Sequence, residues 1–416
     1  MSERLIKKSQ IFQLVVLIVV LPLLAESIYA PGLPALAESF SVSDGIAEAT
    51  LSIYLFGMSV GVLFWGNLSD IVGRKPVLLS GFILFLIATI GCYFSGNIYM
   101  FLLLRFAQAF GGAVSCVTQS INRDVFDQKE RMALSSRIGT AVSVAPAVGA
   151  MLGGLIVQYS QWRESFLLLM FVACFTLSCL HIALPETKQG SYLSLSPRAF
   201  YKATMSVLKD NNLVLNGMII GLGLGILYAF MSEGSFYCIN NLKWSSQAYG
   251  AVCASGSIAY AMGCRLSDQM IQLGVSFQRV MKLGTTVMLI SYVVLLLLLF
   301  HHSTSAQVRL DSAHLDIAFS VLWTLSCLGL SFVLTPCFAN ALENQRENAG
   351  VAASALAFTY NIISATVNLT ITYLHSNERM RMPMIFLVIV LIIAVACDIL
   401  YRNQAKRPVI ADIIAP

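Results

Sequence analysis

Residues 66–75 read Gly66-Asn67-Leu68-Ser69-Asp70-Ile71-Val72-Gly73-Arg74-Lys75, a short charged segment between two long apolar stretches. The segment combines two turn-forming glycines, one acid and two adjacent bases in a chain that is 57% hydrophobic. Glycine permits tight turns because it has no Cβ. Charged side chains are costly inside a bilayer, so a charge cluster between two membrane-length runs is expected at the membrane surface. The segment therefore predicts a surface loop between two membrane-spanning helices.

The composition of the whole chain also indicates a membrane protein. Its 416 residues have a mean hydropathy of +0.77 and only 11% of them are charged, whereas soluble proteins contain about 25% charged residues. A spanning helix needs about 20 apolar residues. We predict twelve spans, with hydropathy most diluted by Gly, Ser and Thr in the fourth, fifth and eleventh, near residues 11–30, 46–66, 76–95, 98–122, 134–157, 164–184, 212–234, 246–267, 280–300, 315–340, 350–374 and 382–401.

The basic residues are divided unevenly between the two sides of the predicted membrane. Of the 26 Lys and Arg residues, 20 fall on the side of the N-terminus, five fall on the opposite side, and Arg105 lies inside a span. Because loops rich in Lys and Arg stay in the cytoplasm, both termini are predicted to be cytoplasmic. The net charge of +5 is explained by this topology, and we predict no nucleic-acid partner.

Several other protein classes are not supported by the sequence. The basic N-terminus and its apolar run resemble a signal peptide, but Pro22 and Glu26 within the run and eleven further spans favour a first membrane helix. The ten cysteines form no C-x-x-C pair, which argues against a zinc site or a disulfide framework. We interpret the histidines of the loop 301–314 as solvated rather than metal-binding. No catalytic set and no nucleotide-binding loop stand out, so we predict no enzyme activity, cofactor, metal or ATPase subunit.

The predicted spans fall into two groups of six. The long polar break from Pro185 to Asn211 separates them, and we predict an N-terminal half over 1–187, a cytoplasmic linker over 188–211 and a C-terminal half over 212–416. Equivalent helices of the two halves share features: each second helix ends in a glycine followed by an Asp, and each first helix contains a Glu. Parallel repeats of this kind are typical of transporters whose halves move about a central site.

Two carboxylates lie well inside predicted spans, Glu26 in the first and Glu233 in the seventh. Ionisable groups inside membranes are rare and mark ion pathways or proton relays. A carboxyl group that exchanges a proton there meets the physical requirement for proton coupling, although a neutral structural hydrogen bond is the alternative. Arg105 in the fourth span cannot lose its proton and must find acceptors. It could modulate a nearby carboxylate or be structural. We predict Glu26, Glu233 and Arg105 as proton-coupling residues.

Two further groups of residues are candidates for conformational change. Asp70, Gly73, Arg74 and Lys75 could form a cytoplasmic gate if their charge pairs form only when that side is closed; otherwise they are a topology signal. The segment 139–154 of the fifth span is rich in small residues, which let helices approach closely and slide. Proline permits bending because it removes a helix hydrogen bond. The candidates in this helix are Pro146, Gly149 and Gly153.

Aromatic residues inside the spans could line a cavity for bulky apolar ligands, although buried tyrosines often serve packing alone. The cavity candidates are Tyr29, Tyr54, Tyr228, Tyr237, Tyr260 and Tyr360.

Several segments of the chain together resemble one family. The chain resembles the major facilitator superfamily and, within it, the twelve-span drug:proton antiporters of the bicyclomycin and chloramphenicol resistance type. The resemblance covers 29–187 densely. Its motifs are the loop 66–75, R-x-x-Q at Arg105 and Gln108, N-x-x-R-D-x-F at 120–126, the helix-5 motif at 145–154, W-R-x-x-F at 162–166, L-P-E-T at 184–187 and Y-x-P-x-L-P at 29–34.

One position departs from this pattern. Many relatives carry an Asp two residues before the tyrosine of the first helix, whereas here Ser27 holds that place and Glu26 precedes it. The acid is thereby displaced by about 100° around the helix. In the second half the resemblance rests mainly on Ser232-Glu233-Gly234-Ser235-Phe236 and on 350–356.

The resemblance implies a proton-coupled exporter of amphipathic small molecules in a bacterial inner membrane, acting by alternating access and expected to be a monomer. Export of an endogenous metabolite, such as a siderophore or peptide, and proton-linked import are the transport alternatives. An intramembrane enzyme or a receptor without transport belongs to a different class. The enzyme would need a convergent catalytic set, and the receptor would bind ligand without flux.

Overall fold

The computed structural model describes residues 2–187, 209–304, 312–343, 349–374, 378 and 380–405, and within them every regular element is a helix. Most of the predicted linker lies outside the described residues, as do residues 305–311 of the loop 301–314. The helices are α1 Ser2–Ser27, η1 Ala30–Gly32, α2 Leu33–Phe40, α3 Asp44–Val72, α4 Arg74–Phe94, α5 Ile98–Gly112, η2 Ala113–Val117, α6 Thr118–Val125, α7 Gln128–Tyr159, α8 Glu164–Ala183, α10 Asn211–Phe236, η3 Tyr237–Asn241, α11 Ser246–Gln272, α12 Phe277–Thr304, α13 Ser312–Ala341, α14 Ala349–Tyr373 and α15 Arg381–Ala405.

The long helices match the twelve predicted spans. Eleven helical segments of the described chain are long and apolar enough to cross a membrane, three of them formed by α1 with α2, α5 with α6, and α10 with η3. The remaining predicted span, the eighth, is α11, which has 27 residues but is the least apolar of the twelve. Its polar residues, including Gln247, Arg265 and Asp268, lower its hydropathy more than the small residues lower that of the fourth, fifth and eleventh. The prediction of an all-helical membrane protein is confirmed.

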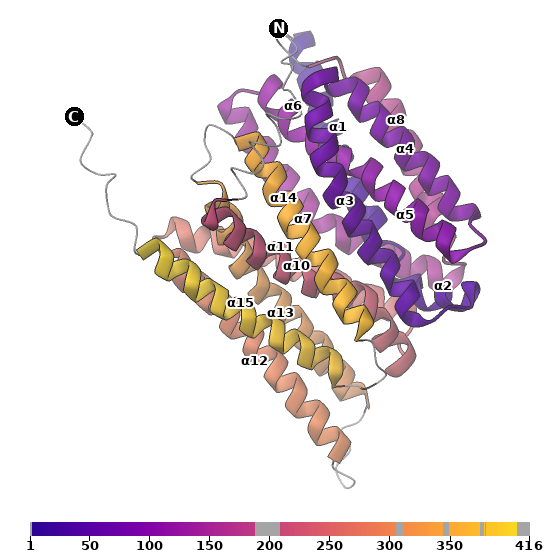
Figure 1. The fold of residues 1–416 in the computed structure, drawn as a ribbon, viewed down its shortest axis with the longest axis vertical. Coiled ribbons are helices and arrows are strands. Elements are labelled where there is room, and N and C mark those ends of the chain that lie inside the picture. The colour runs from indigo at the N-terminus through magenta and orange to yellow at the C-terminus, as the bar shows by residue number, and fades with distance from the viewer. Residues whose placement is uncertain are drawn as a thin grey trace.

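The helices form two groups that meet along a few central elements. In Figure 1, α1, α3, α4, α5 and α8 lie on one side, α12, α13 and α15 lie on the other, and α7, α10, α11 and α14 run between them. The main contacts across the interface join α7 to α11 and α3 to α14. Within the described residues, the two groups of helices thus meet mainly along α3, α7, α11 and α14.

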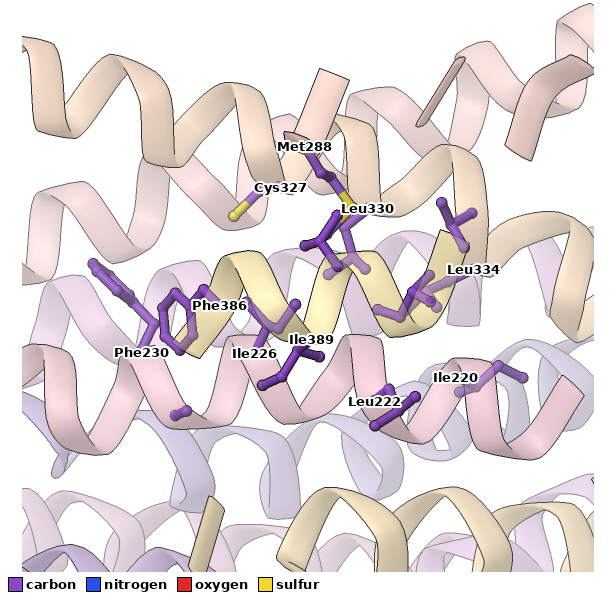
Figure 2. Packing of buried hydrophobic residues seen from close by; sticks show 14 of the residues in the cluster. Ile220, Leu222, Ile226, Phe230, Met288, Cys327, Leu330, Leu334, Phe386 and Ile389 are labelled. Atoms are coloured by element: carbon purple, nitrogen blue, oxygen red, sulfur yellow. The ribbon is translucent and has the colours of Figure 1, made fainter. Parts of the chain in front are cut away.

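Each group has its own apolar core. One core is built almost wholly from residues between Ile11 and Leu184, and the other almost wholly from residues between Leu213 and Leu400. Figure 2 shows part of the second core, where Ile226 and Phe230 of α10 lie against side chains of α13 and α15 such as Leu330 and Phe386. The two six-helix halves therefore pack separately, while the boundaries 187/188 and 211/212 stay predictions.

The outer surface of the bundle is apolar. Phe94, Phe171 and Leu297 are 73%, 67% and 63% exposed. Soluble monomers rarely present contiguous apolar surfaces of this kind. Lipid chains can cover such side chains without the cost that water would impose, and this explains why nearly every helix remains apolar beyond its buried face.

Candidate transport site

Glu26 lies where the two halves meet. The last turn of α1 carries its side chain, which is only 4% exposed. The Tyr228 hydroxyl of α10 hydrogen-bonds to its carboxylate, and the charge of Arg105 on α5 acts on it from within the N-terminal half. Tyr360 of α14 lies close enough to interact electrostatically with the same carboxylate. Glu26 therefore interacts electrostatically with groups of both halves.

Arg105 is fully buried between two tyrosine rings. Its guanidinium carbon lies 4.0 Å from the ring centre of Tyr29 and 4.3 Å from that of Tyr54, a geometry in which the aromatic faces attract the cation. Nη1 donates to the Ala25 carbonyl at 3.2 Å and to Gln108 Oε1 at 2.5 Å. Within the described chain, Nε and Nη2 have no hydrogen-bond partner. The two rings and the electrostatic interaction with the Glu26 carboxylate therefore help to stabilise the buried charge of Arg105.

The two tyrosines beside Arg105 also connect α1 to α3. Tyr54 donates a hydrogen bond to the Pro22 carbonyl at 2.9 Å, and Tyr29 shares one with Thr50 at 3.2 Å. Both rings are almost completely buried. They therefore hold the segment of α1 that carries Glu26 at a defined position on the N-terminal half.

The structure gathers four of the six candidate tyrosines near Glu26 and places the other two elsewhere. Tyr29, Tyr54, Tyr228 and Tyr360 surround the site described above. Tyr237 begins the π-helical turn that follows α10 and stacks on Phe319 at a centroid distance of 5.5 Å, inside the C-terminal core. Tyr260 on α11 packs against the same core.

Glu233 is a second buried carboxylate but belongs to a different part of the interface. It is 6% exposed and follows Tyr228 by five residues on α10, which corresponds to a rise of about 7.5 Å. Its neighbour Ser232 donates a hydrogen bond to Asn368 of α14 at 2.7 Å. The structure therefore brings Arg105 to Glu26 and sets Glu233 beside a separate polar contact.

A third buried carboxylate, Glu48, was missed by sequence reasoning. It lies in the second turn of α3 and has no exposed surface. Glu48 and Ser52 are four residues apart and therefore share a helix face, and Ser52 contacts α14 from that face.

The charged loop 66–75 forms a compact cluster within the N-terminal half. Arg74 is 4% exposed and pairs with Asp70 at 2.6 Å and with Asp124 at 3.3 Å. The Glu186 carboxylate accepts hydrogen bonds from the backbone amides of Arg74 and Lys75 at 3.0 and 3.1 Å. Asp70 thus pairs with a base of its own loop. Asp124 and Glu186 are partners that the sequence did not reveal.

Gly73 permits the sharp turn in this loop. Its φ of 113° ends α3 and starts α4 in a conformation that side chains disfavour, and an added Cβ would lie 2.8 Å from a Glu186 oxygen. The Lys75 ammonium donates to the His181 carbonyl at 2.9 Å. A second ion pair, from Lys8 of α1 to Glu130 of α7 at 2.8 Å, lowers the pKa of Glu130 through the hydrogen bond from Lys8. These contacts join α4 to α3, α6 and α8, and α1 to α7, all within one half.

The glycines of α7 lie at two helix contacts. Gly149 and Gly153 face α1, where an added Cβ would overlap the Ser27 hydroxyl and the Ile28 carbonyl, respectively. Gly154 faces α11 of the other half, where an added Cβ would lie 2.6 Å from the Ser246 carbonyl. α7 runs unbroken through Pro146. This helix therefore approaches both the segment beside Glu26 and the opposite half at backbone distance.

Two helical halves with separate cores and buried charges at their interface define a secondary membrane transporter. The model of the Major Facilitator Superfamily matches residues 15–368. The chain therefore belongs to the Major Facilitator Superfamily. This membership confirms the predicted resemblance and identifies the chain as a multi-pass transporter of small molecules rather than an enzyme.

Several known proteins are similar along most of the chain. An uncharacterized transporter of Rickettsia felis is 29% identical over 370 residues, covering 88% of this chain and 89% of that protein. The bicyclomycin resistance protein homolog of Haemophilus influenzae is 24% identical, with 81% and 82% covered. The multidrug resistance protein MdtL of Escherichia coli is 26% identical, with 79% of each covered. The solved xylose transporter XylE of E. coli has a TM-score of 0.73 at 13% identity, with 94% and 97% covered, which shows the shared fold.

Replacing Gly153 by Ala is expected to destabilise the protein, because the new methyl group would overlap the Ile28 carbonyl. Overpacking of this kind costs about 1–3 kcal/mol. The control is Gly139→Ala on the same helix, where an added Cβ meets nothing within 4 Å. The thermal midpoint of each purified variant in detergent is the measurement. Equal midpoints for the two variants would contradict the close contact between α7 and α1.

Replacing Glu186 by Ala is expected to lower stability by about 1 kcal/mol, as for other residues that cap a helix N-terminus. The substitution leaves two amides at the start of α4 without their carboxylate acceptor. Glu38→Ala, at an exposed position of α2, is the matched control and should change little. Thermal midpoints again provide the comparison, and an unchanged midpoint for the Glu186 variant would show that this cap contributes nothing.

Proposed function

We propose that this protein is a proton-coupled exporter of amphipathic small molecules. The observation that carries the proposal is the position of Glu26, a buried carboxylate that hydrogen-bonds to Tyr228 of one half and interacts electrostatically with Arg105 of the other. A carboxylate in such a place can be compensated by a proton or by a nearby positive charge. A change in its protonation state alters the electrostatic interactions of both halves at once.

In the proposed cycle, Glu26 takes up a proton when the site faces outward, and substrate leaves. When the site faces inward, the proton is released and substrate binds. After the proton has left, the positive charge of Arg105 compensates the Glu26 carboxylate. One charge moving through about 100 mV supplies about 2.3 kcal/mol, enough for a roughly 50-fold substrate gradient.

The substrate class follows from the side chains around Glu26. The rings of Tyr228 and Tyr360 offer apolar faces with hydroxyl groups at their edges, and this suits ligands that are partly apolar and partly polar. The names of two relatives, a bicyclomycin resistance protein homolog and a multidrug resistance protein, support export of such compounds. We also propose a bacterial inner-membrane location with both termini in the cytoplasm, as the distribution of Lys and Arg indicates, and a monomeric transporter.

Substrate-driven proton movement in proteoliposomes tests the direction of coupling. With a pH-sensitive dye inside the vesicles, bicyclomycin or chloramphenicol is added outside. As an antiporter moves substrate inward it carries protons outward, so the lumen becomes more alkaline. A symporter would acidify the lumen. Acidification would overturn the proposal of antiport, and a panel of compounds without any proton signal would overturn proton-coupled export of this class.

Replacing Glu26 by Gln is expected to abolish the dye response while leaving the protein folded, because the amide keeps the size of the carboxyl group but cannot exchange a proton. Counterflow of radiolabelled substrate, which needs no proton gradient, should persist and lose its dependence on pH. Glu38→Gln, an exposed carboxylate of α2, is the control. Unchanged pH dependence in the Glu26 variant would exclude it as the coupling residue.

Glu233→Gln separates the two candidate acids. If Glu26 alone carries the proton, this variant should transport more slowly but keep its dye response. Loss of the response in this variant, together with a normal response in Glu26→Gln, would assign coupling to Glu233. Full pH dependence in both single variants would exclude both acids.

A further inference from the structure

Asn368 of α14 joins the two halves through a buried hydrogen-bond chain. Its Nδ2 donates to Ser52 Oγ of α3, in the N-terminal half, at 2.8 Å. Its Oδ1 accepts from Ser232 Oγ of α10, in its own half, at 2.7 Å. We call Ser52, Asn368 and Ser232 the inter-half clamp. All three side chains are buried, with exposures of 4%, 0% and 0%.

The two bonds of the clamp differ in what a movement of the halves would do to them. The bond from Ser232 lies within the C-terminal half and moves with it. The bond to Ser52 crosses the interface, so it is stretched whenever α3 and α14 separate at this level. Water is excluded from the site in this conformation, and a buried polar group that loses its partner is costly until water replaces it. The clamp therefore favours the conformation in which α3 and α14 touch here.

The clamp lies toward the end of α3 that is remote from the Arg74 cluster. Near the same end, Gly45 approaches the Thr372 backbone, where an added Cβ would lie 3.6 Å from the carbonyl oxygen. Glu233 follows Ser232 directly in α10, and Glu48 precedes Ser52 by one helical turn. A movement of α10 at Glu233 would thus shift the Ser232 hydroxyl, which donates to Asn368 Oδ1 and orients the amide.

We propose that Asn368 is a positioning residue of the transport cycle, which holds α3 against α14 in the present conformation and releases Ser52 when this end of the interface opens. Because its amide bonds to both α10 and α3, Asn368 couples the position of α10 to the contact between α3 and α14. The proposal deepens the proposed function and rests on it for the alternating movement of the two halves, whereas the clamp itself is defined by geometry alone.

The most direct test removes only the bond that crosses the interface. Ser52→Ala keeps the bond between Ser232 and Asn368, so the conformational equilibrium should shift toward opening at this end. Ser364→Ala is the matched control, because this buried serine also lies on α14 but bonds to the Gly221 carbonyl within the same half at 2.9 Å. Both variants are made in the full-length chain and compared by hydrogen–deuterium exchange in detergent.

In Ser52→Ala, we expect backbone amides in 44–56 and 364–374 to exchange about 3- to 10-fold faster, the range that corresponds to loss of one hydrogen bond. Amides at the opposite end, in 66–72 and 352–358, should keep their exchange rates, because α3 and α14 also meet there, with Gly66 close to Ser354, and no bond is removed at that end. A purely structural defect would accelerate exchange at both ends. Faster exchange at both ends, no change, or an equal effect in Ser364→Ala would overturn the proposal.

Two additions keep the result interpretable. If Ser52→Ala does not yield monodisperse protein, Ser52→Cys replaces it, because a thiol is a similar size but a weak hydrogen-bond partner. The exchange measurement involves neither substrate nor proton gradient, so a failure of the proposed drug export leaves the test of the clamp intact. Conversely, an unaltered exchange pattern would refute the proposed role of the clamp but would leave the role assigned to Glu26 untouched.

Discussion

A guanidinium that cannot lose its proton is buried completely inside the N-terminal half, and much of the site follows from this constraint. Burying an uncompensated charge is among the most costly events in folding. Around Arg105 the chain supplies two aromatic faces, the carbonyl of Ala25 and the amide of Gln108. These contacts do not occupy all of its donors, and the Glu26 carboxylate interacts electrostatically with its charge. The positions of Tyr29 and Tyr54 therefore serve the Arg105 charge and, through it, Glu26.

The interface between the halves contrasts with their interiors. Each half has a separate apolar core, so each can move largely as a unit. The contacts between them are short-range and local: glycines that bring α7 and α11 to backbone distance, and the buried amide of Asn368 between α3 and α14. A few such contacts can be exchanged for others without disturbing either core. Bistability of this kind suits a protein whose task is to expose one site alternately to two sides.

The sequence predicted the fold far better than it predicted the partners within the site. Hydropathy locates a span because about 20 apolar residues are needed whatever surrounds them. Among the helices that match the predicted spans, only α11 is less apolar than a spanning helix is expected to be. Hydropathy does not indicate which face of an apolar helix points toward its own core, toward the other half or toward lipid. α10 is buried on nearly every side, so nothing in its pattern distinguished Tyr228, beside Glu26, from Tyr237, inside the core. Glu186 reaches Arg74 across 112 positions and Asn368 reaches Ser52 across 316, and only folding brings such residues together.

The displaced acid of α1 has a steric explanation. Ser27 faces Gly149 of α7, where an added Cβ would lie 3.2 Å from the Ser27 Cβ, and its hydroxyl turns back to the Leu23 carbonyl at 2.9 Å. A carboxylate at position 27 would have to enter this contact between two helices of the same half. Position 26 is about 100° around the helix and faces Tyr228 of the other half instead. The close approach of α7 thus leaves position 26 as the place where an acid can interact with groups of both halves.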